Sequence, residues 1–240
     1  MLDLARIRGL CFDIDGTLAD TDDHLVGQLA AVLDRLPLVS GRRADRLARG
    51  AVMALAPSVN RAYGTLDRLH LDGPLYRVRQ AARRLRRPED TRNPRAADEV
   101  PHEMMPGVRD MLHRLAARFP MCTISTGGAA RVEAFLAHYG VRGCFEAVIT
   151  AQTTRRMKPH PEPLRHAARV MGIPPEACLM IGDTEVDILT AVRAGAQSVG
   201  VLCGFGTARE LRAAGADLVL ADTADVEGAL GARNARRDAR

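Results

Sequence analysis

The sequence predicts an α/β fold in which helices cover both faces of a parallel β-sheet and a helical insertion interrupts the sheet. Three observations lead to this prediction. Short apolar strands alternate with helices from Pro106 onward, which is typical of a parallel sheet buried on both faces. A similar apolar run, Gly9 to Phe12, lies near the start, and residues 24–100 between the two parts show helical patterns only. The 240 residues suffice for one such core with a small insertion.

The N-terminal part contains one predicted strand and then the insertion. Residues 9–12 form the strand, and Thr21 or Asp22 can cap the first inserted helix. Apolar residues then recur at helical spacing, and a proline or an Asp-Gly-Pro sequence ends each of four segments. These segments are 25–36, 47–55, 59–69 and 75–85. Four helices without a strand predict a small helical unit within the first crossover.

The C-terminal part alternates between strands and helices after a helix that begins at Pro106-Gly107. The predicted strands are 121–125, 147–151, 178–181, 198–202 and 217–220. The helices that follow them are 129–138, 162–171, 186–194, 208–213 and one near Val226. In such folds a ligand binds beyond the carboxyl ends of the strands, where the strand order reverses. We therefore expect the functional site in the turns that follow the strands.

Composition and charge argue against several classes of function. With 47% hydrophobic and 26% charged residues, the chain has no apolar run near the ~20 residues of a membrane span. It also lacks a leader pattern, so we expect a cytoplasmic protein with no membrane partner. The net charge of +5 comes from residues 24–103 and 231–240, where few aromatic residues accompany the basic ones. Nucleic-acid binding is therefore not expected.

Cysteine usage favours a reducing compartment. Four of the five cysteines, Cys11, Cys122, Cys178 and Cys203, fall in or beside predicted strands, and no Cys-x-x-Cys pair occurs. We expect these residues to be small, buried and unpaired, without a disulfide framework.

Two aspartates, Asp13 and Asp15, follow the first predicted strand directly. On an extended chain residues i and i+2 point the same way, so both carboxylates can face one site. Gly16 and Thr17 come next and indicate a turn. Two like charges so close need a cation or a shared proton. The alternative is an ordinary acidic surface turn.

Polar residues also follow three later strands. Ser125-Thr126-Gly127-Gly128 offers a hydroxyl and backbone N–H groups at a helix start, which suits a phosphate oxygen, although a helix N-cap is the alternative. Lys158 is the one lysine among 34 basic residues, which suggests that its position needs a compact ammonium group. Asp183 follows a strand and Asp187 lies one helical turn on, with helix capping as the alternative.

Together these residues predict a metal-dependent phosphoryl-transfer site. Four carboxylates without His or Cys favour Mg2+ over zinc. Asp13 is the predicted nucleophile, and Asp15 is the predicted acid and then base. Asp13, Asp183 and the backbone carbonyl of Asp15 are predicted to hold Mg2+, and Asp187 to orient these ligands. The predicted phosphate-binding residues are Ser125, Thr126, Gly127 and Lys158.

The run Asp13-x-Asp15-Gly16-Thr17-Leu18-x-Asp20 resembles the first motif of the haloacid dehalogenase-like hydrolase superfamily, whose members are mostly Mg2+-dependent phosphatases. Ser125, Lys158-Pro159-x-Pro161 and Gly182-Asp183-x-x-x-Asp187 match its second, third and fourth motifs. The resemblance implies a three-layer Rossmann-like core, an inserted α-helical C1 cap and an aspartyl-phosphate. Asp15 separates the chain from the dehalogenases, which lack this acid. Pro106-Gly107-Val108 and residues 158–164 are most similar to phosphoglycolate phosphatases.

This resemblance implies a core of residues 1–20 and 101–230, a cap of residues 21–100 and a basic flexible tail of residues 231–240. We expect a small phosphorylated metabolite as substrate, a monomer or homodimer, and a cap that moves on hinges near 19–22 and 100–105. The cap residues that are candidates for substrate contact are Asn60, Arg61, Tyr63, Arg68 and His70. Two alternatives remain: a phosphohexose mutase of β-phosphoglucomutase type, and a phospho-accepting signalling module, which is shorter and has no cap.

Overall fold

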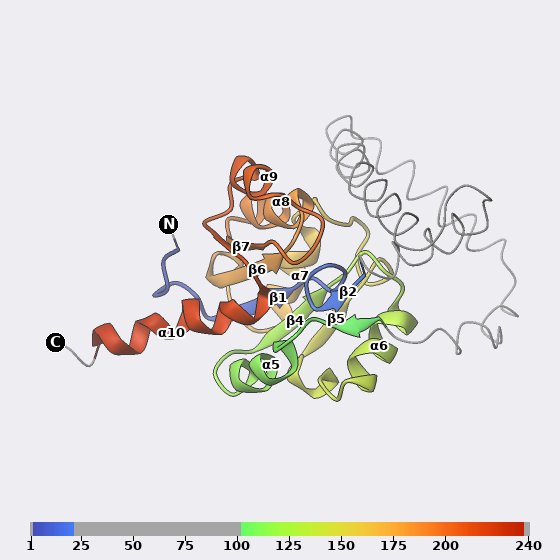
Figure 1. The fold of residues 1–240 in the computed structure, drawn as a ribbon. Helices are drawn as coiled ribbons and strands as arrows, with labels where there is room; N and C mark the ends of the chain where they lie inside the picture. Colours follow the sequence, from blue (N-terminus) through green and yellow to red (C-terminus); the bar gives the residue numbers. More distant parts are fainter. Residues whose placement is uncertain (1, 22–101, 238–240) are drawn as a thin grey trace, which may run out of the picture.

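The computed structural model of the protein describes residues 2–21 and 102–237. The predicted insertion, 21–100, lies outside the described residues except for Thr21, and so do its four predicted helices. The cap candidates that fall outside with it are Asn60, Arg61, Tyr63, Arg68 and His70. What the structure describes is the predicted core (Figure 1).

The core is built on a six-stranded sheet in which every pair of neighbouring strands is parallel. The strand order is β5-β4-β1-β6-β7-β8. The strands are β1 (Gly9–Phe12), β4 (Met121–Ile124), β5 (Ala147–Ile149), β6 (Cys178–Gly182), β7 (Gln197–Val201) and β8 (Leu218–Leu220). The chain builds outward from β1 to β5 and then returns to place β6 on the other side of β1. Strand order therefore reverses at β1, the strand that leads to Asp13 and Asp15.

Helices cover both faces of the sheet, as the α/β pattern predicts. They are α5 (Val108–Ala116), α6 (Ala129–His138), α7 (Glu162–Val170), α8 (Glu185–Ala194), α9 (Ala208–Ala214) and α10 (Val226–Arg237). On one face Leu10 and Phe12 pack in a core with residues of α5, α6 and α10. On the other face Cys11 packs with residues of α7 and α8. Because successive strand residues point to opposite faces, the short β1 joins both cores of this three-layer fold (Figure 1).

The predicted elements from Pro106 onward all occur, with boundaries that differ from the predicted ones by at most two residues. The largest shift is β5, which ends at Ile149, where residue 151 was expected. Thr150 ends the strand because its hydroxyl accepts a hydrogen bond from the Gln152 backbone and its own N–H donates to the hydroxyl of Thr153. Such local side-chain bonds compete with a strand ladder.

The last helix extends further than the sequence predicted. α10 continues to Arg237, into the segment 231–240 that was expected to be a tail without regular structure. This segment is rich in alanine and arginine, which are among the strongest helix formers, so a helix already begun at Val226 continues through it. The sequence placed a helix near Val226 without giving its end, and the structure puts that end at Arg237.

The two connections to the insertion form a structure that the sequence did not predict. β2 (Ala19–Asp20) and β3 (Glu103–Met104) pair as an antiparallel two-stranded sheet, with Ala19 opposite Met104. The N–H of Met105 also donates to the carbonyl of Leu18, at 2.9 Å. The segments expected to be two separate hinges are thus hydrogen-bonded to each other. Strands of two residues leave no periodic pattern that a sequence can reveal.

All five cysteines are free, in agreement with the prediction. Cys203 differs from the others because it lies just beyond β7 and is only partly buried. Its thiol lies 3.5 Å from the carbonyl oxygen of Gly16, in the turn that follows the first aspartates. Separately, none of the helices in the described part of the chain combines the length and hydropathy needed to span a bilayer.

Candidate active site

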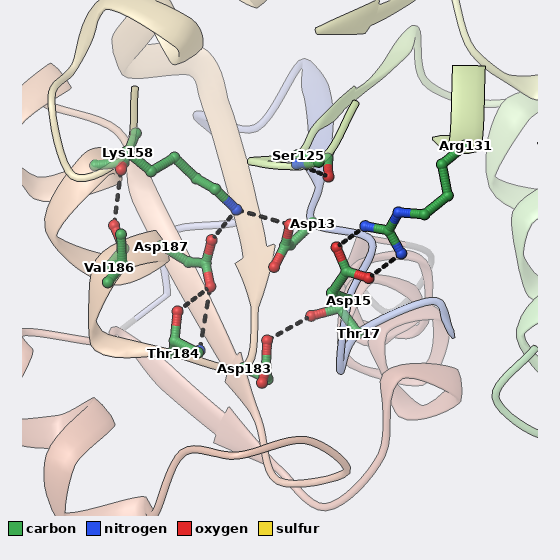
Figure 2. A network of polar contacts seen from close by, with 12 residues as sticks. Asp13, Asp15, Thr17, Ser125, Arg131, Lys158, Asp183, Thr184, Val186 and Asp187 are labelled. Atoms are coloured by element: carbon green, nitrogen blue, oxygen red, sulfur yellow. Dashed lines mark hydrogen bonds and ion pairs between the residues drawn. The ribbon is translucent and has the colours of Figure 1, made fainter. Parts of the chain in front are cut away.

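Asp13 lies at the carboxyl end of β1, where its backbone N–H donates to the carbonyl of Ile181 at 2.9 Å. This bond continues the pairing of β1 with β6 and holds the backbone at the strand end. The side chain is buried, and its Oδ1 forms an ion pair of 2.7 Å with Nζ of Lys158 (Figure 2). Two sequence-predicted residues that are far apart in the chain thus meet at the predicted sheet edge.

Lys158 binds two carboxylates at once. Its Nζ lies 2.7 Å from Oδ1 of Asp13 and 2.6 Å from Oδ1 of Asp187. Burial by itself lowers the pKa of the ammonium group, but the charges of Asp13 and Asp187 outweigh burial and raise the pKa of Lys158 above its usual value. Lys158 therefore remains a buried cation over the whole working range of pH.

Asp187 has a second function in the helix to which it belongs. It occupies the third position of α8, and its Oδ2 accepts hydrogen bonds from the backbone N–H of Thr184 at 3.1 Å and from its hydroxyl at 2.6 Å. This reciprocal arrangement is a capping box. The N-cap residue of α8 is thus Thr184, with Asp187 as its partner in the capping box, and Asp183 does not cap this helix. The contact with Thr184 leaves the other oxygen of Asp187 to bind Lys158.

Asp183 lies beyond the end of β6 and is fully buried. Its Oδ1 accepts a hydrogen bond of 3.2 Å from the hydroxyl of Thr17, and its Oδ2 accepts one of 2.9 Å from the N–H of Phe205. Gly16, with φ of +77°, and Gly204 make room for this carboxylate, because a Cβ at either position would collide with it. Three loops therefore converge on one acidic side chain.

The three carboxylates form a site that fits a divalent cation. Ligand oxygens of Asp13, Asp183 and Asp187 lie within 4.8 Å of one another. Burial, with the charge of Asp187, raises the pKa of Asp13 to about 7, and the same two causes raise the pKa of Asp183 well above its usual value. Lys158 compensates one of three negative charges, so a bound cation would remove the remaining repulsion. Hard oxygen donors without His or Cys match the preference of Mg2+.

The predicted phosphate-binding turn follows β4. Ser125 is buried, and its hydroxyl accepts a hydrogen bond of 3.0 Å from the N–H of Gly127. The N-cap of α6 is Gly128, without a side-chain hydrogen bond, so the alternative in which Ser125 or Thr126 caps this helix does not hold. Thr126 is exposed. Figure 2 labels Ser125 of this turn and draws its hydroxyl with this hydrogen bond.

Asp15 occupies a different environment from the other three acids. Its carboxylate forms two hydrogen bonds with Arg131 of α6, from Nη1 to Oδ1 at 2.8 Å and from Nη2 to Oδ2 at 2.7 Å. The two side chains are 28% and 38% exposed, so the pair lies at the rim of the site (Figure 2). Asp15 does not contribute a side-chain oxygen to the cluster of Asp13, Asp183 and Asp187.

Comparison with known proteins identifies the family of the chain. The profile of the haloacid dehalogenase-like hydrolase family matches residues 7–195. The chain belongs to this family. A curated member, phosphoglycolate phosphatase of Chromobacterium violaceum, is 29% identical over 231 residues, which cover 94% of this chain and 97% of the relative.

Solved structures show the same fold for this haloacid dehalogenase-like hydrolase. A haloacid dehalogenase-like hydrolase of Bacteroides fragilis aligns with a TM-score of 0.64 at 24% identity, over 92% of this chain and 99% of that one. A family member from Deinococcus radiodurans, solved with bound phosphate and sodium, aligns with a TM-score of 0.63 at 23% identity, over 94% and 96% of the two chains.

Arg131 and Thr17 are the site residues that the sequence reasoning missed in this family member. Arg131 is one of many arginines, and nothing in its neighbours marks it. Thr17 was used only as a sign of a turn, although its hydroxyl binds Asp183. Both contacts join residues more than a hundred positions apart, so they depend on the fold and leave no local pattern.

Proposed function

We propose that this hydrolase cleaves phosphate monoesters of small metabolites through an aspartyl-phosphate on Asp13. The observation that carries the proposal is the buried contact of Asp13 with Lys158 inside a cluster of three carboxylates. Lys158 binds one oxygen of Asp13, and we assign the other as the nucleophile. A carboxylate nucleophile beside a fixed ammonium group suits attack on a phosphoryl group, whose negative charge the ammonium can bind.

The reaction then has two balanced halves. In the first, an oxygen of Asp13 forms a bond to phosphorus, the ester P–O bond breaks, and Asp15 gives its proton to the leaving alcohol oxygen. In the second, water attacks the same phosphorus and gives its proton to Asp15, and the bond between Asp13 and phosphorus breaks. Inorganic phosphate leaves, and both aspartates return to their starting states.

We assign the metal site to Asp13, Asp183 and the backbone carbonyl of Asp15, with Asp187 and Thr17 orienting the ligands. Bound Mg2+ would neutralise the clustered carboxylates and polarise the phosphoryl oxygens. The chain's own contribution is the cradle around Asp183, where Thr17 and Phe205 fix both carboxylate oxygens. Such supporting hydrogen bonds raise metal affinity by holding the ligands in place.

We assign the grip on the phosphoryl oxygens to Lys158 and to the turn Ser125-Thr126-Gly127. Lys158 contributes the buried positive charge, and Ser125 contributes a buried hydroxyl at the strand end. Thr126 is exposed, so its backbone N–H is the group that we expect to take part. This set has both the charge and the hydrogen-bond donors that a phosphate dianion requires.

The first substrates to test are small phosphorylated acids such as phosphoglycolate. The relative from C. violaceum is named phosphoglycolate phosphatase, and its similarity to this chain extends over nearly the full length of both. We further propose that residues 21–100 form a cap that selects among esters. Family membership argues against a signalling module, since the match is to a hydrolase and extends over residues 7–195. A mutase would use the same residues and remains the alternative.

The decisive experiment is a screen of about a hundred phosphate esters with purified full-length protein and Mg2+, with release of phosphate as the readout. We expect turnover without any bisphosphate activator, and none with Asp13→Asn at equal protein concentration. A requirement for a bisphosphate would favour the mutase. Equal turnover by wild type and Asp13→Asn would contradict the aspartyl-phosphate.

A further inference from the structure

The contact between Arg131 and Asp15 is built with more precision than an ordinary rim ion pair. Both terminal guanidinium nitrogens donate, each to its own carboxylate oxygen, at 2.8 and 2.7 Å. Such a fork fixes the plane of a carboxylate as well as its position, which a single ammonium cannot do. Arg131 lies in the first turn of α6, so a rigid element of the core presents the fork.

The neighbouring turn is shaped around the guanidinium. A Cβ at Gly127 would lie 2.6 Å from Nη2 of Arg131 and 3.1 Å from the hydroxyl oxygen of Ser125. At the adjacent Gly128 a Cβ would meet nothing within 4 Å. Of these two glycines, only Gly127 borders the guanidinium so closely that a Cβ would force the end of the Arg131 side chain to shift. The guanidinium therefore reaches Asp15 past the turn that we assign to phosphate binding.

We propose that Arg131 is the positioning residue of Asp15, holding its carboxylate in the direction from which it exchanges a proton with the ester oxygen and with the attacking water. This inference rests on the proposed function, because it takes Asp15 as the acid and base. Once Asp15 has given its proton to the leaving oxygen, it is the carboxylate that the fork binds. Two guanidinium donors match the two acceptor oxygens that an unprotonated Asp15 offers between the two half-reactions.

The test compares two esters whose leaving groups differ in their need for a proton. p-Nitrophenolate leaves readily without one, whereas a simple alkoxide does not. For Arg131→Met with Mg2+, we expect kcat/KM for an alkyl phosphate to fall about 10- to 100-fold, the scale of a misplaced catalytic group. We expect kcat/KM for p-nitrophenyl phosphate to change by less than about threefold, since kcat/KM reports the first half-reaction.

The chain offers a matched control in Arg114, which binds Glu227 through Nε at 2.8 Å to both carboxylate oxygens and joins α5 to α10. Arg114→Met removes a similar exposed pair outside the candidate active site, so we expect the same ratio of the two kcat/KM values as in wild type. Arg131→Lys keeps the charge but not the fork, and we expect an intermediate loss with the alkyl ester. If Arg131→Met does not fold, Arg131→Lys is judged by the same ratio.

A second comparison separates positioning from a general loss of structure. In an Asp15→Asn background, adding Arg131→Met should cause no further loss with the alkyl ester, because the group being positioned is already gone. Equal losses for both esters, or a full additional loss in the Asp15→Asn background, would overturn the inference. The proposed function fails in a different way, through a wild type without phosphatase activity or an active Asp13→Asn.

Discussion

Asp13 and Asp15 lie two residues apart in one turn, yet the fold gives them opposite surroundings. The Asp13 side chain is 9% exposed and contacts the ammonium of Lys158, which is itself 4% exposed. The Asp15 side chain is 28% exposed and contacts the guanidinium fork of Arg131. One acid is buried beside two other carboxylates, and the other stands at the rim away from that cluster.

This difference matches the two tasks that the proposed reaction requires. A nucleophile must be held against phosphorus and shielded from water, and the compact charge of Lys158 does this without covering the second oxygen of Asp13. An acid and base must meet both the leaving alcohol and the incoming water, which a rim position allows. Two carboxylates acquire different roles because their environments differ, although their side chains are identical.

The largest expected loss of activity comes from replacing the buried carboxylate, Asp13. Asp13→Asn should lower kcat by about 10⁴-fold or more, because the amide keeps the shape but cannot form the phosphoenzyme. Asp15→Asn should lower kcat less, by about 10²- to 10⁴-fold, since it removes proton transfer alone. Phosphate release measured for both variants checks this, and a larger loss in Asp15→Asn would reverse our assignment of the two roles.

Removing the metal should also abolish activity, because its proposed ligands Asp13 and Asp183 are buried in the carboxylate cluster. Chelation should abolish turnover and Mg2+ should restore it, whereas Ca2+ should inhibit because it accepts more ligands in a looser geometry. The measurement is phosphate release from purified protein after dialysis against a chelator, with each metal added back. Full activity after exhaustive chelation would contradict the assignment of Asp13 and Asp183 as ligands.

Replacing each of the two basic side chains by the other type should lower kcat/KM by different factors. Lys158→Arg should lower kcat/KM about 100-fold, because a longer planar group does not fit the buried position between Asp13 and Asp187. Arg131→Lys should lower it about tenfold or less, since the rim leaves room for a shorter side chain to approach Asp15. Steady-state kinetics of the two variants tests the comparison, and near-normal turnover in Lys158→Arg would show that compactness is not what the site requires.

Stability should depend on pH through Asp13 when no metal is present. Its pKa rises from 3.8 to about 7 on folding, so between these values the folded protein binds a proton that the unfolded chain has lost. The contribution is present in full below about 3.8 and is lost as pH rises through about 7. Its upper bound is about 4 kcal/mol. With a chelator present, the Tm of the protein should therefore decrease as the pH is raised from 5.5 to 8. Added Mg2+ should raise Tm more at pH 8 than at pH 5.5.

The control for this prediction is Asp13→Asn, which lacks the titrating carboxyl and should lose much of the decline in Tm. An equal decline in wild type and variant would assign the pH dependence to other groups. Asp183 is expected to contribute in the same direction, because its pKa is also raised.

The smallest expected effect is found by comparing alanine substitutions at two glycines that both have a positive φ, Gly16 and Gly172. Gly16 has φ of +77° and Gly172 has φ of +65°, so alanine at either position should cost about 1 kcal/mol of stability. A Cβ at Gly16 would collide with Asp183, whereas one at Gly172 would meet nothing within 4 Å. Gly16→Ala should therefore also raise the Mg2+ concentration needed for half-maximal activity, by about tenfold. Equal metal dependence in the two variants would show that Asp183 is not the ligand that Gly16 accommodates.

Several predictions from the sequence are confirmed for particular physical reasons. Alternating apolar strands and helices leave one arrangement that buries both sheet faces, and this arrangement brings the carboxyl ends of β1, β4 and β6 to one edge. Asp13, Ser125, Lys158, Asp183 and Asp187 are found at this edge because each follows a strand or the turn after it. The cap, its residues and the roles of all site residues stay predictions.

What the sequence determined by itself is local: the strand ends, the helix periods and the spacing of acids within a turn, all of which depend on neighbours along the chain. Only the tertiary structure decided which partner each charged group acquires. Lys158 and Asp187 are 29 positions apart in the sequence, and Arg131 and Asp15 are 116 positions apart. Whether residues so far apart come into contact depends on the order of the strands in the sheet. The pairing of β2 with β3 is likewise a meeting of distant segments. The division between a buried Asp13 and a rim Asp15 is therefore a property of the fold, because burial and ion pairing arise only when the helices close over the sheet.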